Sequence, residues 1–122
     1  MTTTLVWVGV TMLGGFGAVA RLTVDKAVSR RAPRAFPYGT LVVNVSGALL
    51  LGFFAGMVLP PHIALMAGTG FVGSYTTFST WMLETHRLAE ERQSWPAVAN
   101  IVVSVGLGIP AALAGQSLGA LL

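Results

Sequence analysis

Residues 69–81 read Thr69-Gly-Phe-Val-Gly-Ser-Tyr-Thr-Thr-Phe-Ser-Thr-Trp81, a run of glycines and hydroxyl residues. The run lies inside a longer tract, residues 35–83, that carries no formal charge. Polar residues that weaken a helix are tolerated at membrane depth only where they are buried in protein or line a pathway. We therefore expect the function of the chain to depend on this run.

The composition indicates an integral membrane protein. Of the 122 residues, 54% are hydrophobic and 9% are charged, and the mean hydropathy is +0.76. A soluble domain of this size does not have enough interior to bury so much apolar surface. All Lys, Arg, Asp and Glu residues fall within residues 21–34 or 84–92. The three tracts left without charge predict an all-α membrane protein.

The lengths of these tracts predict four transmembrane helices, because about 20 residues cross a hydrocarbon core of about 30 Å. The long middle tract holds two helices with Pro60 and Pro61 as the hinge, and Trp95 and Pro96 mark the start of the last helix. We expect one transmembrane domain, residues 1–122, with helices at about residues 3–24, 37–59, 62–88 and 95–120.

The first tract has an alternative interpretation as a signal peptide, because Ala18, Val19 and Ala20 resemble a cleavage site. No Lys or Arg precedes the tract, however, so we expect it to be retained as the first helix. The glycines at its end, Gly14, Gly15 and Gly17, predict close packing against another helix.

The sequence pI of about 10.2 does not indicate a nucleic-acid partner. Residues 21–34 hold five basic residues and one acidic residue, whereas residues 84–92 hold two basic and three acidic residues. A solvated loop or an interaction with anionic lipid headgroups explains this pattern. Arg21, at the end of the first span, either reaches toward headgroups or draws anions into a vestibule.

Two helices carry a polar stripe. Thr40, Asn44 and Gly47 share one face of the second helix, and Asn100 and Ser104 share one face of the fourth. The Asn44 amide either makes an interhelical hydrogen bond or donates to a passing anion. Together the two stripes could form one polar track.

The third helix is predicted to break near residues 73–76, because glycines precede this interval and Ser74 lies within it. A break releases backbone carbonyls that need a partner in lipid. The carbonyls of Gly73 and Thr76 could coordinate a small hard cation such as Na⁺, or the glycines could form only a kink satisfied by a neighbouring helix.

Two aromatic side chains lie on one face of the helix that follows the break, because Phe78 and Trp81 are three residues apart. The edge of an aromatic ring is electropositive and attracts an anion. The alternative is ordinary aromatic packing against lipid or another helix.

Three segments of the chain together resemble the CrcB/Fluc family of small four-helix fluoride channels. They are Gly14-Gly-Phe-Gly-Ala-Val-Ala-Arg21, Pro37-Tyr-Gly-Thr-Leu-Val-Val-Asn44-Val-Ser-Gly47 and Gly70-Phe-Val-Gly-Ser-Tyr-Thr-Thr-Phe-Ser-Thr80. The resemblance covers the first three helices closely and the fourth mainly by length and polar spacing. This sequence departs from the family pattern at Trp81, where Phe is usual, and at Asn100, where an aromatic residue is often found.

The resemblance implies an antiparallel dimer of inverted subunits in the bacterial inner membrane, with two fluoride pores and a central Na⁺. The chain would export cytoplasmic fluoride passively and would not be an enzyme. The implied pore residues are Asn44, Phe78, Trp81, Ser79, Thr80 and Ser104, with Arg21 in the vestibule and the Gly73 and Thr76 carbonyls on Na⁺.

Other functions find less support in the residues. A proton-coupled transporter needs an ionisable group in mid-span, and the uncharged tracts offer only His62 beside the proline pair. No constellation of nucleophile, base and orienting group indicates an enzyme. A structural subunit does not require a broken helix.

The partner in the dimer is either a second copy of the chain or an oppositely oriented paralogue. Both charged segments lie on the same side of a four-span protein, so Lys and Arg count seven on one side and none on the other. The positive-inside rule then commits the chain to one orientation, which favours a paralogue.

Overall fold

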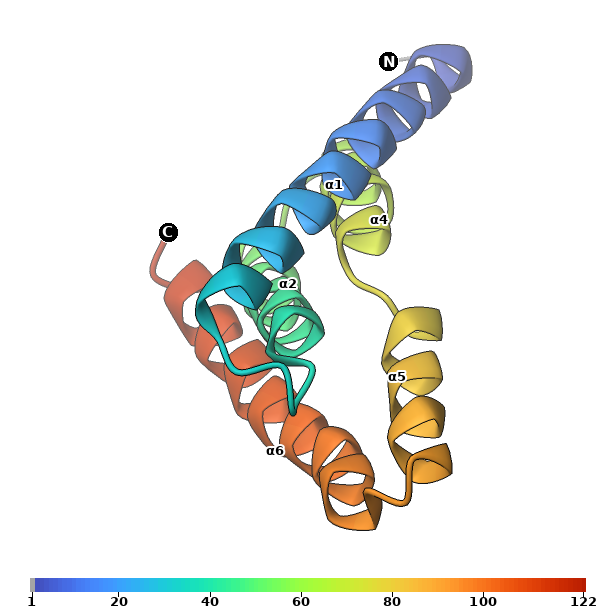
Figure 1. Cartoon of the computed structure of the whole chain (residues 1–122). Helices are drawn as coiled ribbons and strands as arrows, with labels where there is room; N and C mark the ends of the chain where they lie inside the picture. Colours follow the sequence, from blue (N-terminus) through green and yellow to red (C-terminus); the bar gives the residue numbers. More distant parts are fainter. Residues whose placement is uncertain (1) are drawn as a thin grey trace.

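The computed structural model describes residues 2–122, and these residues form helices joined by short connections (Figure 1). Three long helices are α1 (Thr3–Arg31), α2 (Tyr38–Met57) and α6 (Ser94–Gly119). Between α2 and α6 lies a segmented run of α3 (Pro61–Ala64), the π-helix η1 (Leu65–Val72), α4 (Gly73–Tyr75) and α5 (Ser79–Glu90). Residues 2–122 contain no strand, which confirms the all-α prediction.

Helices α1, α2 and α6 are long and apolar enough to cross a membrane, judged by length and composition. This confirms that the chain is a helical membrane protein. The predicted third helix corresponds to the segmented run, in which no single element has the length of a span.

The first helix extends well beyond its predicted end near residue 24 and stops at Arg31. Its last turns are charged, but no proline interrupts them before Pro33. Arg30 and Arg31 also lie in the last turn, where the helix dipole favours a positive charge. Charge ends the apolar span in this region, whereas the helix itself continues.

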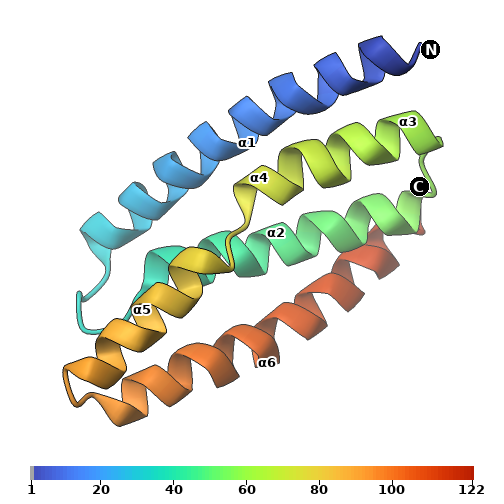
Figure 2. The same ribbon diagram turned by 90° about the vertical axis from the view of Figure 1, so that its right-hand side faces the viewer.

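Helices α2 and α6 run parallel and pack backbone to backbone through four glycines (Figure 2). A Cβ atom added to Gly52 or Gly56 would collide with the carbonyl oxygens of Ala112 and Gln116 on α6. A Cβ atom on Gly115 or Gly119 would collide with those of Leu49 and Phe53 on α2. Small residues permit such close approach in lipid, where packing rather than the hydrophobic effect holds helices together.

Helix α1 packs on η1 and α4 in a similar way. A Cβ atom on Gly17 would collide with the Phe71 carbonyl oxygen, and one on Gly70 would lie 3.1 Å from the Val10 carbonyl oxygen. The close packing predicted for the end of the first helix is therefore present at Gly17. Gly15 differs, because nothing would lie within 4 Å of its Cβ atom.

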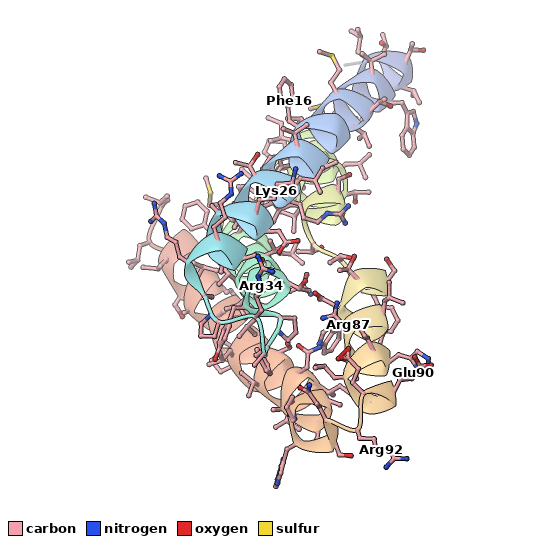
Figure 3. All side chains as sticks on the ribbon, viewed as in Figure 1. Phe16, Lys26, Arg34, Arg87, Glu90 and Arg92 are labelled. Atoms are coloured by element: carbon pink, nitrogen blue, oxygen red, sulfur yellow. The ribbon has the colours of Figure 1, made fainter. Side chains whose placement is uncertain are left out.

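The charged residues gather at one end of the molecule. Figure 2 shows the end of α1, the α1–α2 connection, the end of α5 and the start of α6 at one end, and both chain termini at the other. In Figure 3, Lys26, Arg34, Arg87 and Arg92 lie toward the charged end, and Phe16 lies farther along α1.

We predict that Gly115→Ala destabilises the folded protein by about 1–3 kcal/mol, because the methyl group would force apart two helices already in backbone contact. The matched control is Gly106→Ala on the same helix, where nothing would lie within 4 Å of the new Cβ atom. Denaturant titration of the helical circular dichroism signal in detergent measures both. Equal stability of the two variants would contradict the packing described.

Candidate functional site

The helical run is interrupted between Tyr75, the last residue of α4, and Ser79, the first of α5. Thr76 has an extended backbone with φ −85° and ψ 163°, while its N–H and its Oγ1 both donate to the Val72 carbonyl at 3.0 and 2.9 Å. Gly73 retains helical angles, φ −59° and ψ −35°. The interruption thus begins at the far end of the interval predicted from the glycines, and Gly73 itself remains helical.

The Asn44 side chain satisfies the interrupted backbone. Its Nδ2 donates to the Thr77 carbonyl oxygen at 2.8 Å, and its Oδ1 accepts from the Thr77 N–H at 2.8 Å. One amide therefore pairs with both polar groups of residue 77 and ties α2 to the break. Because Nδ2 carries two hydrogens, one N–H of Asn44 is left for another acceptor.

A cavity of about 350 Å³ lies beside the break. Its lining includes Asn44, Thr77, Phe78, Trp81 and Ser104, so four of the predicted pore residues share one space although they come from three helical segments and the break. Ser104 is buried, and its Oγ has no hydrogen-bond partner within residues 2–122. The cavity therefore joins an unpaired hydroxyl to the Asn44 amide.

The two predicted aromatic residues contact each other edge to face. The ring centroids of Phe78 and Trp81 lie 5.9 Å apart, and the ring planes make an angle of 84°. Phe78 is 70% exposed in the single chain. The Trp81 indole N–H donates to the Asn100 carbonyl oxygen at 3.0 Å, so the polar atom of this ring is already used and its carbon edge remains.

Asn100, which we expected on the polar track, does not line this cavity. Its side chain is fully buried, and its Nδ2 donates to Thr85 Oγ1 at 2.9 Å and to the Trp81 carbonyl oxygen at 3.4 Å. With the indole bond to its own carbonyl, Asn100 fastens α5 to α6. It lies one helical turn from Ser104, where α6 faces α5 rather than the cavity.

A second cavity of about 70 Å³ continues toward the charged end. It is lined by Arg21, Asp25, Thr40, Thr77 and Thr80, among others. Thr77 lines both cavities and so lies between them. Arg21 and Thr80 thus fall beside the predicted track, whereas Ser79 lines neither cavity.

Two residues of these cavities were not assigned from the sequence. Thr77 lies within the hydroxyl run, and its neighbours drew the interpretation instead. Asp25 gave no signal, because it reads as one charge among many in the segment 21–34. A pattern of polar residues along a chain does not reveal which of them face the same space.

A cation at the break would need backbone ligands. Within residues 2–122, no group of three or more His, Cys, Asp or Glu side chains is placed to hold a metal. The hydrogen bonds around the break use the carbonyls of Val72, Thr77 and Phe78 and leave those of Gly73 and Thr76 without a donor among these residues. Carbonyl oxygen is a ligand that suits Na⁺.

Comparisons with known proteins agree with this architecture. A family model described as "CrcB-like protein, Camphor Resistance (CrcB)" matches residues 8–116. The chain is similar to "Fluoride-specific ion channel FluC 2" of Mycobacterium tuberculosis, at 64% identity over 93% of this chain and 90% of the relative.

Two further relatives carry similar names. The chain is 66% identical to "Fluoride-specific ion channel FluC 2" of Mycolicibacterium paratuberculosis, over 97% of each chain. It is 43% identical to "Fluoride-specific ion channel FluC 1" of Symbiobacterium thermophilum, over 93% of this chain and 96% of the relative.

Proposed function

This chain belongs to the CrcB family, and from that membership we propose that it is a fluoride-specific ion channel rather than an enzyme. It exports cytoplasmic fluoride passively, down the electrochemical gradient of the anion, and so lowers fluoride toxicity. The names of its relatives support this assignment, and the donors in the larger cavity supply the chemistry.

The observation that carries the proposal is the buried Ser104 hydroxyl, which has no partner in the described chain and faces the same cavity as Asn44. Fluoride is small and strongly hydrated, so a dry pathway must replace its water with hydrogen-bond donors. The Ser104 O–H and the second Asn44 N–H are such donors. The carbon edges of Phe78 and Trp81 add weaker electropositive contacts.

Neutral donors suit conduction, because an ion must enter and also leave. The larger cavity is lined by no charged side chain, and Arg21 lines the smaller one. In the proposed pathway fluoride passes from the Arg21 end, along the hydroxyls of Thr80 and Thr77, to Asn44 and Ser104. Phe78, exposed in the single chain, would contact the partner subunit.

We predict that Ser104→Ala slows fluoride efflux about 10- to 100-fold, the loss expected for one hydrogen bond to a charged ligand. The fold should not suffer, because the hydroxyl has no partner in the described chain. The matched control is Ser117→Ala on the same helix, whose exposed hydroxyl bonds only to the Leu113 carbonyl. A fluoride electrode follows efflux from proteoliposomes. Unchanged efflux in Ser104→Ala would remove this hydroxyl from the pathway.

The proposal includes an antiparallel dimer with two pores and a structural Na⁺ at its centre. The segmented run would be the third of four spans, broken in mid-membrane. Gly73 is exposed and its carbonyl has no donor in the described chain, as is true of the Thr76 carbonyl. Two inverted copies of the break would together offer four such oxygens to one cation.

We predict that Na⁺ favours dimer assembly of the parent chain and of Thr76→Val, which keeps the carbonyl, but not of Gly73→Leu. Within one subunit a Cβ atom on Gly73 would meet only the Gly68 carbonyl oxygen at 3.7 Å, so any loss must arise at the partner or the ion. Crosslinking in Na⁺ against N-methylglucamine measures assembly. A parent chain indifferent to Na⁺ would sink this site.

The subunit that completes the dimer is proposed to be an oppositely oriented paralogue. Residues 21–34 and 84–92, which hold all seven Lys and Arg residues, lie toward one end of the molecule. The positive-inside rule would hold this end in the cytoplasm of a bacterial inner membrane. A homodimer of inverted copies instead needs a chain that inserts both ways in equal numbers.

We predict that a C-terminal reporter fused to this chain reports one orientation, with the C-terminus outside the cytoplasm. Paired cytoplasmic and external reporters score the fraction inserted each way. The control is a fusion in which Arg30, Arg31 and Arg34 are changed to Gln, which lowers the charge bias and should mix the orientations. An equal split in the parent, together with efflux from the chain alone, would restore the homodimer.

A further inference from the structure

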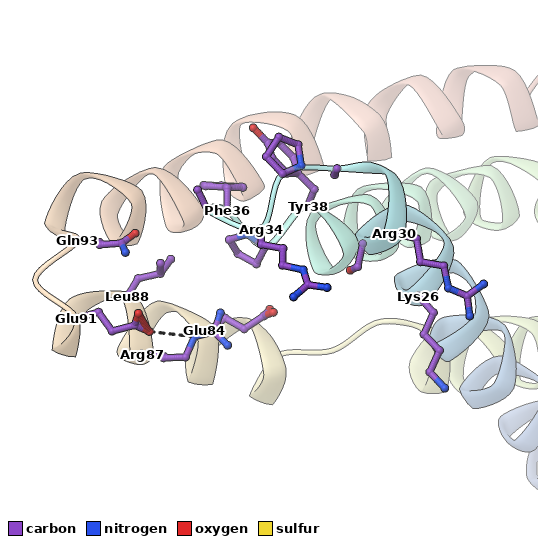
Figure 4. A pocket seen from close by; sticks show the side chains of 15 residues that line it. Lys26, Arg30, Arg34, Phe36, Tyr38, Glu84, Arg87, Leu88, Glu91 and Gln93 are labelled. Atoms are coloured by element: carbon purple, nitrogen blue, oxygen red, sulfur yellow. Dashed lines mark ion pairs between the residues drawn. The ribbon is translucent and has the colours of Figure 1, made fainter.

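The largest cavity of the described chain lies apart from the proposed pathway, at the charged end. It measures about 750 Å³ and lies between the end of α1 with its connection to α2 on one side and α5 with the start of α6 on the other (Figure 4). In Figure 4 the Arg34 side chain extends from the connection into this space, opposite Glu84 and Arg87 on α5. The volume far exceeds that of a single fluoride ion.

The cavity has an excess of positive charge. Four basic residues line it, Lys26, Arg30, Arg34 and Arg87, against the two acids Glu84 and Glu91. Arg87 is already paired with Glu91, at 3.6 Å between Nε and Oε1. Within residues 2–122 no ion pair involves Lys26, Arg30 or Arg34, and the first two lie one turn apart on α1. Three cations therefore face a single unpaired acid.

The remaining wall is apolar and aromatic. Phe36 and Tyr38 line the cavity with their ring centroids 5.0 Å apart, and Leu88 lies opposite on α5. Tyr38 is also the first residue of α2, one of the apolar candidate spans. The cavity therefore begins where the apolar part of the protein ends, which is the level of lipid headgroups. A ligand that fits here is anionic and also has an apolar part.

We propose that this cavity binds the phosphate and glycerol of an anionic phospholipid from the surrounding leaflet. Arg30 and Arg34 hold the phosphate, because a guanidinium group matches phosphate oxygens with two parallel donors. Lys26 adds charge, and the aromatic pair packs against the glycerol and the first acyl carbons. Basic pockets between helices on the cytoplasmic side recognise anionic headgroups in this way.

A bound lipid would bridge two parts of the chain that the protein itself joins weakly. The α1–α2 connection contributes Arg34, and α5 contributes Arg87 and Leu88, to opposite walls of the cavity. The lipid would thereby tie this connection to the half of the segmented run that carries Phe78 and Trp81. The site is independent of fluoride conduction, because it shares no lining residue with the cavity that contains Asn44 and Ser104.

The test compares two double variants of the full-length chain in neutral detergent. Arg30→Gln with Arg34→Gln removes two charges from the cavity, and Arg31→Gln with Arg92→Gln removes two charges that do not line it. Native mass spectrometry titrates phosphatidylglycerol, phosphatidylcholine and inorganic phosphate against each. We expect phosphatidylglycerol to bind the parent and the second variant, and the first variant to bind it about 20-fold more weakly.

Each other outcome overturns the proposal. Equal losses in the two variants would mean that net charge alone attracts the lipid. Equal binding of phosphatidylcholine would mean that the headgroup charge is not recognised. If inorganic phosphate at the same concentration displaced the lipid completely, the ligand would be a soluble phosphate and not a phospholipid. Circular dichroism confirms that both variants retain the helical content of the parent.

Discussion

A backbone interrupted inside a membrane must find partners for its N–H and C=O groups within the protein, because the hydrocarbon offers none. Here the Asn44 side chain meets that constraint by pairing with both polar groups of Thr77 at 2.8 Å. The rest of the arrangement follows from this bond pair. It fixes α2 against the break, while the glycine contacts fix α6 against α2, so that Ser104 on α6 faces the same cavity as Asn44. Removing the amide would leave the peptide unit without a partner and would also release α5.

Charge and hydrogen-bond donors occupy separate regions of the molecule. The cavity beside the break offers an amide, hydroxyls and ring edges, whereas the Lys and Arg residues lie toward the other end of α1 and α5. This separation suits the proposed channel, since positive charge can raise the local concentration of an anion without trapping it in mid-pathway. The same positive charge, beside an aromatic pair, gives the outer cavity its affinity for an anionic headgroup.

Trp81 and Asn100 show how neighbours determine the role of a side chain. Both are polar or amphipathic residues that the sequence places on helix faces near the pathway, yet their polar atoms are used on each other and on Thr85. Trp81 therefore presents carbon to the cavity, as a phenylalanine would. Asn100 holds α5 against α6 from a site where it is 0% exposed.

The sequence by itself determined the membrane class, the helical fold, the position of the charged end and the group of residues around the cavity. These follow from composition and spacing, because apolar length and helical periodicity are properties of the chain alone. Tertiary structure decided where the helix breaks, since the amide of Asn44, distant in sequence, selects residue 77 rather than the glycines that weaken the helix. It also decided that Asn100 fastens two helices while Ser104, one turn away on the same face, keeps an unpaired hydroxyl. The physical reason is that a polar group in a membrane protein takes the partner that packing brings within reach, and the close approach of backbones at glycines sets that reach.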